Sequence, residues 1–289
     1  MHSSHLSKVS LVIVVLQALF LADFTIPSDV AAGNTNVNYV IWETGVGSST
    51  PLGSSKEHDL NRYETLRLLV VLLSKSMYIA PSVVMSEQDN WIHFVVAKSE
   101  RNVVLALLCS LLNTAAKYNP LGWGLPYNHV VFSDPREVLV VMCLRAVLVL
   151  LDYQSPGHAS YRISANEQQA RKEIERVSIE IRNPPEERKE IGEDSEAPAT
   201  LPATISSGQQ ELNVDNAFRH YLSKLHRPQD FQFLVDGMYR ILSNPMLANN
   251  TYLPGSTKHV RCHVETMMLC WKLLEINQVR FDDKWSKWI

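Results

Sequence analysis

Histidines, a cysteine and an acid fall close together near residue 260, and these side chains could bind a metal. His259 and His263 are four residues apart, with Cys262 and Glu265 beside them. On one face of a helix, two such imidazoles could serve as zinc ligands. A third ligand is not evident, and the glutamate does not stand between the histidines as the HExxH pattern requires. We therefore expect partly exposed polar positions, with no metal and no cofactor.

Two polar turns could hold other chemistry. His129, in the segment Pro126-Tyr127-Asn128-His129, could act as a general base, but no serine or cysteine nucleophile stands in a recognisable elbow. His226 and Arg227 precede a helix that starts at Pro228, where Arg227 could grip a carboxylate or phosphate. We expect His129 to fix its turn by hydrogen bonds and Arg227 to have a structural capping role.

A pair of glycines suggests a phosphate site, but its context argues against one. In Thr44-Gly45-Val46-Gly47 no strand-to-helix pattern and no Lys-Ser/Thr follows the glycines. The spacing therefore predicts a turn. With no phosphate loop, triad or metal cluster in view, we expect a protein that is not an enzyme.

The elements that position these turns centre on residues 102–153. Apolar pairs recur every three to four residues from Val103 to Ala115, which is the period of a helix. A second helix is predicted from Pro135, with Asp134 as its N-cap and Glu137 in its first turn. The run 138–151 is apolar on nearly every side and too short to span a membrane, so we expect a helix buried among others. A buried strand is the alternative, because valine is abundant.

The global composition fits a cytosolic helical protein. The chain has 289 residues, a net charge of −3 and 46% hydrophobic residues, so it can bury a sizeable core and shows no excess of positive charge for nucleic acid. Its four cysteines, at positions 109, 143, 262 and 270, lie in apolar runs without a CxxC motif. Such cysteines are expected to be small buried hydrophobes.

The chain divides into six predicted regions, which form an all-α, irregular stack resembling an α-solenoid. An apolar N-terminal helix covers residues 1–32, and its core, 9–22, reads from composition equally well as a core helix or a secretory signal. The other regions are a loop at 33–58, a helical core at 59–154, a charged, proline- and serine-rich disordered insertion at 155–213, more helical core at 214–278 and a divergent tail at 279–289. Further helices are expected to begin at a cap on Asp59 or Asn61 and to cover residues 216–225, 228–242 and 259–277.

Several segments of the chain, taken in order, form a recognisable set. They are Tyr39 to Gly47, Asn61-Arg62, Glu64 to Leu72, Ser74 to Tyr78, Ser110 to Thr114, Tyr118-Asn119-Pro120, Pro126 to His129, Val130 to Glu137, Leu225 to Phe233, Asn244-Pro245 and Tyr252 to Ser256. These segments resemble the high-temperature-induced dauer-formation protein family, relatives of dymeclin, and their order and spacing are similar to the fungal branch. The resemblance covers roughly residues 11–278 outside the insertion.

The resemblance implies a large helical protein held peripherally on Golgi membranes, without enzymatic activity. Family members act in protein sorting and secretory-vesicle formation, so the expected partners are proteins of the trafficking machinery, and the expected location is the cytoplasmic side of the Golgi. Position 2 is His2 and not the glycine that a myristoyl anchor requires. The resemblance favours a core helix at 9–22, and family length predicts that this chain is a fragment. The alternative is a secreted or membrane-tethered protein, for which Asn249-Asn250-Thr251 would be a glycosylation site.

We expect the turn residues to lock the angle between the two buried central helices, with partner binding as a further role. This candidate interaction site consists of Tyr118, Asn119, Pro120, Pro126, Tyr127, Asn128, His129, Asp134, Arg136, His226 and Arg227. Loss of the Asp134 cap should cost about 1 kcal/mol. Truncation of Leu111 or Leu148 to alanine should cost ~2–5 kcal/mol.

Overall fold

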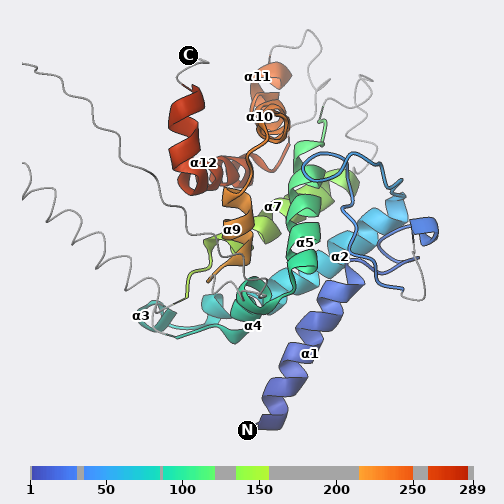
Figure 1. Ribbon diagram of the computed structural model, residues 1–289, viewed down its shortest axis with the longest axis vertical. Coiled ribbons are helices and arrows are strands. Elements are labelled where there is room, and N and C mark those ends of the chain that lie inside the picture. The colour runs from blue at the N-terminus through green and yellow to red at the C-terminus, as the bar shows by residue number, and fades with distance from the viewer. Residues whose placement is uncertain are drawn as a thin grey trace, which may run out of the picture. The chain divides into compact units, whose positions relative to one another are not determined.

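The computed structural model describes residues 2–30, 36–84, 87–120, 135–155, 215–249 and 260–285, and every long element in them is a helix (Figure 1). Within these ranges the extended backbone makes only isolated bridges, such as the one between Leu21 and Val37. The predicted all-α class is therefore confirmed for the described part of the chain.

Ten α-helices are described. In chain order they are α1 His2–Ala18, α2 Lys56–Leu72, α3 Pro81–Val84, α4 Asn90–His93, α5 Arg101–Ala116, α7 Pro135–Asp152, α9 Ala217–Ser223, α10 Pro228–Leu242, α11 Asn244–Asn249 and α12 His263–Trp285. Two 3-10 turns, η1 Ser28–Val30 and η2 Lys75–Tyr78, and one π-helical segment, η3 Phe94–Lys98, join them. A non-helical residue, Asn277, kinks α12.

The α5 and α7 helices form the centre of the core, as their apolar sequences predict. From Val103 to Ala116, α5 buries all but one residue. The α2, α5, α9 and α12 helices all pack on α7, and Leu139, Val147 and Leu150 of α7 are fully buried. A helix without a polar face needs neighbours on most sides, and α7 has them. The strand alternative for 138–151 is wrong.

The α2 helix begins earlier than predicted. Its N-cap is Ser55, whose Oγ accepts a hydrogen bond from the backbone N–H of His58 at 3.1 Å, while Nδ1 of His58 accepts one from the N–H of Ser55 at 3.3 Å. This reciprocal pair satisfies two of the helix's unpaired amides. The expected caps, Asp59 and Asn61, lie inside the helix, so the predicted start was wrong and the loop before it ends at Ser55.

The α12 helix begins later than predicted, at His263 and not at residue 259. The N–H of Val260 donates to Oδ1 of Asn244 at 3.1 Å, and the N–H of Arg261 donates to Oε1 of Glu137 at 3.0 Å. These long-range bonds hold residues 260–261 outside the helix. The described helix therefore does not extend back beyond His263, and residue 259 lies outside the described residues.

The α1 helix is buried along one side near its C-terminal end. Val12, Val15 and Leu16 are at most 4% exposed, whereas Val14 is 58% exposed. The side chains of Leu19 and Phe20, directly after the helix, are also buried. In the described ranges, no helix reaches the length and apolarity that crossing a bilayer needs.

A short polar contact joins the end of α7 to the start of α9. Asn216 caps α9 by accepting from the N–H of Arg219 at 3.2 Å, and its Nδ2 donates to the carbonyls of Leu150 at 2.7 Å and Tyr153 at 3.1 Å. This contact joins the chain just before residues 156–214 to the chain just after them. Those residues lie outside the described ranges, as does the disorder predicted for 155–213.

Candidate functional site

A row of polar side chains on α5 receives the loop that precedes α2. Ser110, Asn113 and Lys117 are three and four residues apart, so they share one face of an otherwise apolar helix. Oγ of Ser110 accepts from the backbone N–H of Trp42 at 3.1 Å. The row therefore fixes a loop that lies almost seventy residues earlier in the chain.

Asn113 makes the central contacts of this row. Its Oδ1 accepts from the N–H of Val46 at 2.8 Å, and its Nδ2 donates to the carbonyls of Glu43 at 2.8 Å and Val46 at 3.0 Å. The Asn113 side chain is fully buried. Its amide thus replaces the water that these loop groups would otherwise need.

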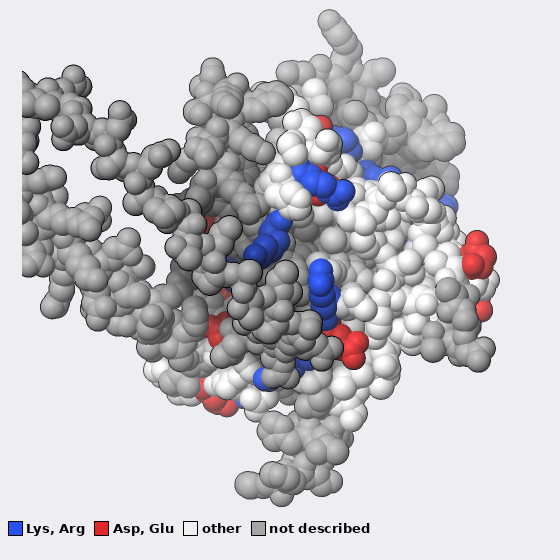
Figure 2. All heavy atoms as spheres, in the orientation of Figure 1, with Lys and Arg blue, Asp and Glu red and all other residues white. Residues whose placement is uncertain are grey.

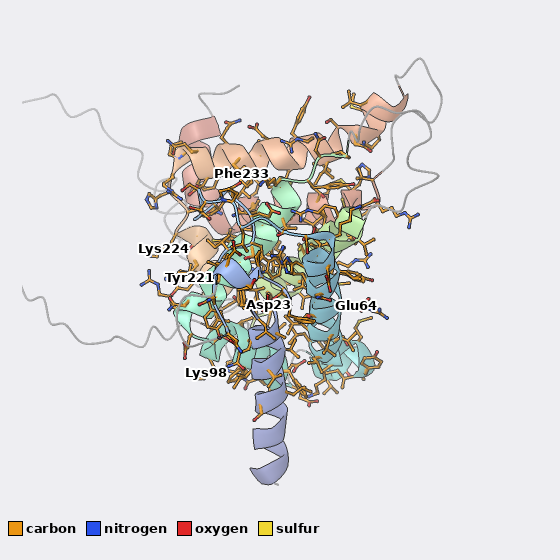
Figure 3. The ribbon with its side chains drawn as sticks, turned by 90° about the vertical axis from the view of Figure 1, so that its right-hand side faces the viewer. Asp23, Glu64, Lys98, Tyr221, Lys224 and Phe233 are labelled. Carbon is orange, nitrogen blue, oxygen red and sulfur yellow. The ribbon has the colours of Figure 1, made fainter. Side chains whose placement is uncertain are left out.

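The loop bends at the two glycines that the sequence placed in a turn. Gly45 has φ of 149° and Gly47 has φ of 74°, both in the region that side chains disfavour. A Cβ on Gly45 would lie only 2.5 Å from the ring of Phe233, which comes from α10 (labelled in Figure 3). The loop is therefore held between α5 and α10, and the predicted turn is confirmed.

Five charged residues meet where this loop, α2, α5 and α7 converge, and we call them the charged hub: Glu43, Asp59, Arg62, Lys117 and Arg136. Oε2 of Glu43 accepts from Nζ of Lys117 at 2.9 Å, and Oε1 accepts from Arg136. Arg136 also donates from Nη1 to Oδ2 of Asp59 at 2.6 Å. Arg136 therefore joins the first turn of α7 to both α2 and the loop.

Arg62 is the most deeply buried member of the hub. Its side chain is 0% exposed; Nε donates to the carbonyl of Thr25 at 2.7 Å and Nη1 donates to Oδ1 of Asp59 at 3.1 Å. The guanidinium carbon lies 4.9 Å from the centre of the Trp42 ring, a cation–π contact. Nη1 also donates to Oγ of Ser54 at 2.6 Å, so hydrogen bonds and the ring together replace the water that this buried cation would otherwise bind.

The electrostatics of the hub favour the charged forms of its paired groups. Burial alone would raise the pKa of Glu43, but the hydrogen bonds and charges of Lys117 and Arg136 outweigh it and lower that pKa. Burial would lower the pKa of Arg136, and the adjacent Asp59 and Glu43 reverse this and raise it. For Arg62 burial wins, and its pKa falls to about 10. These groups stay ionised near neutral pH, so they act as fixed charges that hold the elements together.

The exposed charges on the face drawn in Figure 2 are of both signs. Blue side chains lie around the middle of that face, and red ones lie mostly toward its lower and right-hand margins. In the described residues, no group of three or more histidine, cysteine or acidic side chains is placed to hold a metal ion.

The four cysteines are free thiols, and three of them, Cys109, Cys143 and Cys262, are buried. Burial raises the pKa of Cys109 to about 11, of Cys143 to about 12 and of Cys262 to about 11. A thiol reacts as its thiolate, so these three side chains behave as small buried hydrophobes, as the sequence predicted.

The candidate residues that follow α5 lie along the C-terminal end of that helix. Tyr118 is buried, and its carbonyl accepts from Nη1 of Arg240, in the last turn of α10, at 3.3 Å. Asn119 is exposed and Pro120 is buried.

The other described candidates lie in two different places. Arg136 belongs to the charged hub. Arg227 pairs with Asp230 at 2.8 Å and 3.2 Å in the first turn of α10, and exposed His226 lies with Nδ1 3.0 Å from the carbonyl of Lys224. Arg227 occupies the cap position without a side-chain cap bond of its own. The structure thus attaches Tyr118 and Arg227 to opposite ends of α10 and gathers only Arg136 into the hub.

The remaining candidates, Pro126, Tyr127, Asn128, His129 and Asp134, lie outside the described residues. The predicted lock between α5 and α7, and the Asp134 cap, therefore stay predictions. The described part of the lock is Arg136, which ties α7 to α2 directly and reaches α5 through Glu43 and Lys117.

Sequence reasoning missed most of the hub. Asp59 was expected to be a helix cap, and Glu43, Arg62 and Lys117 received no role. The available signal was the row of polar residues that interrupts the apolar α5, because a polar side chain at a buried helix position needs a partner. The partners of Asn113 and Lys117 lie 67–74 residues earlier in the sequence, so a local sequence pattern cannot identify them.

Comparison of the amino-acid sequence with known proteins finds a matching family and several relatives. A family model described as high-temperature-induced dauer-formation protein matches residues 3–179 and 193–282. Human protein HID1 is 33% identical over 277 residues, and the mouse protein of that name is 34% identical over 278 residues; each alignment covers 93% of this chain and 30% of the relative. A Schizosaccharomyces pombe protein named Ubp5-interacting protein ftp105 is 25% identical over 272 residues, covering 91% of this chain and 24% of that protein. The chain therefore spans less than a third of the length of these relatives, and no solved structure matches it.

Proposed function

Because the chain belongs to the high-temperature-induced dauer-formation protein family, we propose that it is a non-catalytic helical scaffold that acts peripherally at Golgi membranes in protein sorting and secretory-vesicle formation. In this role, the packed helices offer docking surfaces to proteins of the trafficking machinery. The name of the fission yeast relative describes an interaction with another protein, which is consistent with a docking role.

The observation that supports this proposal is the way the hub uses its charges. Both carboxylate oxygens of Glu43, both of Asp59 and two nitrogens of Arg136 bond to one another or to Arg62 and Lys117. An acid–base catalyst needs a group whose pKa lies near the working pH, whereas Glu43 is driven away from neutrality. The best-organised polar cluster of the described chain therefore serves rigidity, which is what a scaffold requires.

The test is the location of the full chain, tagged at its C-terminus, in cells. We expect a Golgi pattern and release from membranes by high salt or alkaline carbonate, as for a peripheral protein. Diffuse signal without Golgi enrichment would contradict the proposal. Secretion with glycan on Asn249 would support the signal-sequence alternative instead.

Two matched variants of α1 separate these outcomes. Val14 is 58% exposed and Leu16 is 4% exposed. If 9–22 is a core helix, Val14→Arg should leave abundance and location unchanged, while Leu16→Arg should lower abundance because it buries a charge. If the run is a signal sequence, either arginine interrupts the apolar stretch and both variants should block secretion.

A further inference from the structure

The first part of α12 carries a row of apolar residues on its outer face. Between His263 and Asn277, the exposed positions are Val264 at 61%, Met267 at 54%, Met268 at 51%, Trp271 at 68% and Leu274 at 44%. Their spacing of three and four residues places them on one face. We call these five residues the α12 stripe.

The acidic and basic residues of the same span point the other way. Glu265 pairs with Arg145 of α7 at 3.0 Å, and Lys272 pairs with Asp152 at the end of α7 at 2.7 Å. Glu275 pairs with Arg219 of α9 at 2.8 Å. The charges therefore fasten α12 to α7 and α9, beside which it lies in Figure 1. Leu269 and Leu273 of the same span are buried, and the five exposed apolar side chains face away from the core.

This span of α12 therefore has two apolar faces, an inner one that includes Leu269 and Leu273 and the outer stripe. In a water-soluble protein the apolar stripe of a helix packs on the core and charged residues face solvent. A contiguous exposed apolar patch marks an interaction surface. The five residues are between 44% and 68% exposed, so together they leave on the order of 500 Å² of apolar surface uncovered.

We propose that the α12 stripe is the contact surface between two copies of the chain, which pack α12 against α12 in antiparallel orientation. The stripe is nearly symmetric about position 269: Val264 and Leu274 are each five residues from it, and Met267 and Trp271 are each two residues from it. Antiparallel pairing therefore sets Val264 opposite the partner's Leu274, and Met267 opposite the partner's Trp271. A methionine sulfur beside an aromatic ring is a favourable contact.

The charge pattern also suits a second copy. A two-fold interface brings the same patch of both chains together, so any charge on the stripe would face a like charge. The stripe has none, because its neighbours Glu265, Lys272 and Glu275 are engaged with α7 and α9. The same ion pairs hold α12 in place before association.

The area sets the expected strength. Two stripes bury on the order of 1,000 Å² between them, slightly below the lower end of the range of about 1,200–2,000 Å² for stable specific interfaces. The association should therefore be reversible and concentration-dependent, with monomer at low and dimer at high micromolar concentrations.

The primary test is sedimentation equilibrium of the full 289-residue chain over a dilution series. We expect the wild type to shift from monomer to dimer mass, and Trp271→Lys or Met267→Glu to remain monomeric throughout. Met77→Lys is the matched control, since Met77 is 80% exposed on η2 and lies outside the stripe. Circular dichroism melts should show that all three variants fold.

Mixing the two monomeric variants tests the antiparallel register. In a mixed pair, Glu at position 267 of one chain faces Lys at position 271 of the other, and the second such contact keeps its natural methionine and tryptophan. An equimolar mixture of Met267→Glu and Trp271→Lys chains should therefore recover dimer mass, and the recovery should weaken with salt.

Three outcomes would overturn the proposal. One is a wild type that stays monomeric across the series, and another is a dimer that Trp271→Lys leaves intact. The third is a monomer whose tryptophan fluorescence shifts on addition of phosphatidylcholine–phosphatidylserine vesicles but not with protein concentration, with no such shift in Trp271→Lys, which would assign the stripe to a membrane surface.

Discussion

The α7 and α12 helices are both long and both carry many apolar residues, yet their neighbours cover them to different extents. Around α7, neighbours α2, α5, α9 and α12 cover most faces, and its first turn is fixed by Arg136. Around α12, the neighbours α7, α9 and α10 leave one face open. The difference shows that charged residues here mark where helices are fastened, and apolar residues alone do not mark the inside.

The largest expected contrast is between matched leucines on these helices. Leu150 of α7 is 0% exposed and Leu274 of α12 is 44% exposed. Leu150→Ala should lower the free energy of unfolding by ~2–5 kcal/mol, because it opens a cavity. Leu274→Ala should change it by about 0.5 kcal/mol or less in urea titrations at dilute protein. Equal losses would mean that the α12 face is covered within one chain.

The next largest effect should come from the charged hub. Arg136→Ala leaves Glu43 and Asp59 without their shared partner, and we expect a loss of about 2–3 kcal/mol, less than for fully buried pairs because the Arg136 side chain is 25% exposed. The control is Arg145→Ala, which removes the 55% exposed partner of Glu265 on α12 and should cost below about 1 kcal/mol. If both substitutions lowered the free energy of unfolding by the same small amount, the charged hub would not hold α7 more firmly than the surface ion pair holds α12.

A smaller effect is expected where α10 crosses α5. A Cβ on Gly237 would lie 2.4 Å from the carbonyl oxygen of Ala116, so the two helix backbones touch there. Gly237→Ala should separate them and destabilise the fold by ~1–3 kcal/mol, partly offset by the better helix propensity of alanine. A thermal melt that showed stabilisation would place the helices farther apart than described.

The sequence predicts those features of the fold that depend on residues close together in the chain. The α5, α7 and α10 helices follow from apolar periodicity and, for α7 and α10, from proline at the first helical position, and the predicted bounds are close to those observed. The predicted start of α2 was wrong because the capping box of this helix pairs the N-cap Ser55 with a histidine, His58, in place of the usual glutamate or glutamine. The start of α12 was misplaced because Asn244 and Glu137, far away in sequence, bind the residues before it.

The hub and the α12 stripe were harder to predict for a different reason. The bonds of the hub join residues up to 93 positions apart, and nothing near Glu43 signals Arg136. The spacing of Val264, Met267, Trp271 and Leu274 shows an amphipathic helix but does not tell which side faces the core. The burial of Leu269 and Leu273, together with the ion pairs of Glu265, Lys272 and Glu275, settles that orientation.

The smallest effect should appear as a pH dependence. The pKa of Glu43 in the folded protein lies below its ordinary value of 4.5, so its stabilising contribution is complete above that value and is lost as the pH falls through the lower, folded pKa. The stability difference between wild type and Glu43→Gln, measured by urea unfolding, should be constant near neutral pH and shrink below about pH 4.5. A difference that grew on acidification would contradict the pairing of Glu43.

The contact between Asn216 and the end of α7 has a consequence for how this chain tolerates change. Because the side-chain amide spans from α9 to the carbonyls of Leu150 and Tyr153, the points where the chain leaves and re-enters the helical unit are neighbours. Closing a longer segment between fixed neighbouring ends adds only about 0.6 kcal/mol for each doubling of its length. A change in the number of residues between 156 and 214 should therefore cost the helical unit little stability, and evolution can alter the length of this stretch without changing how the helices pack.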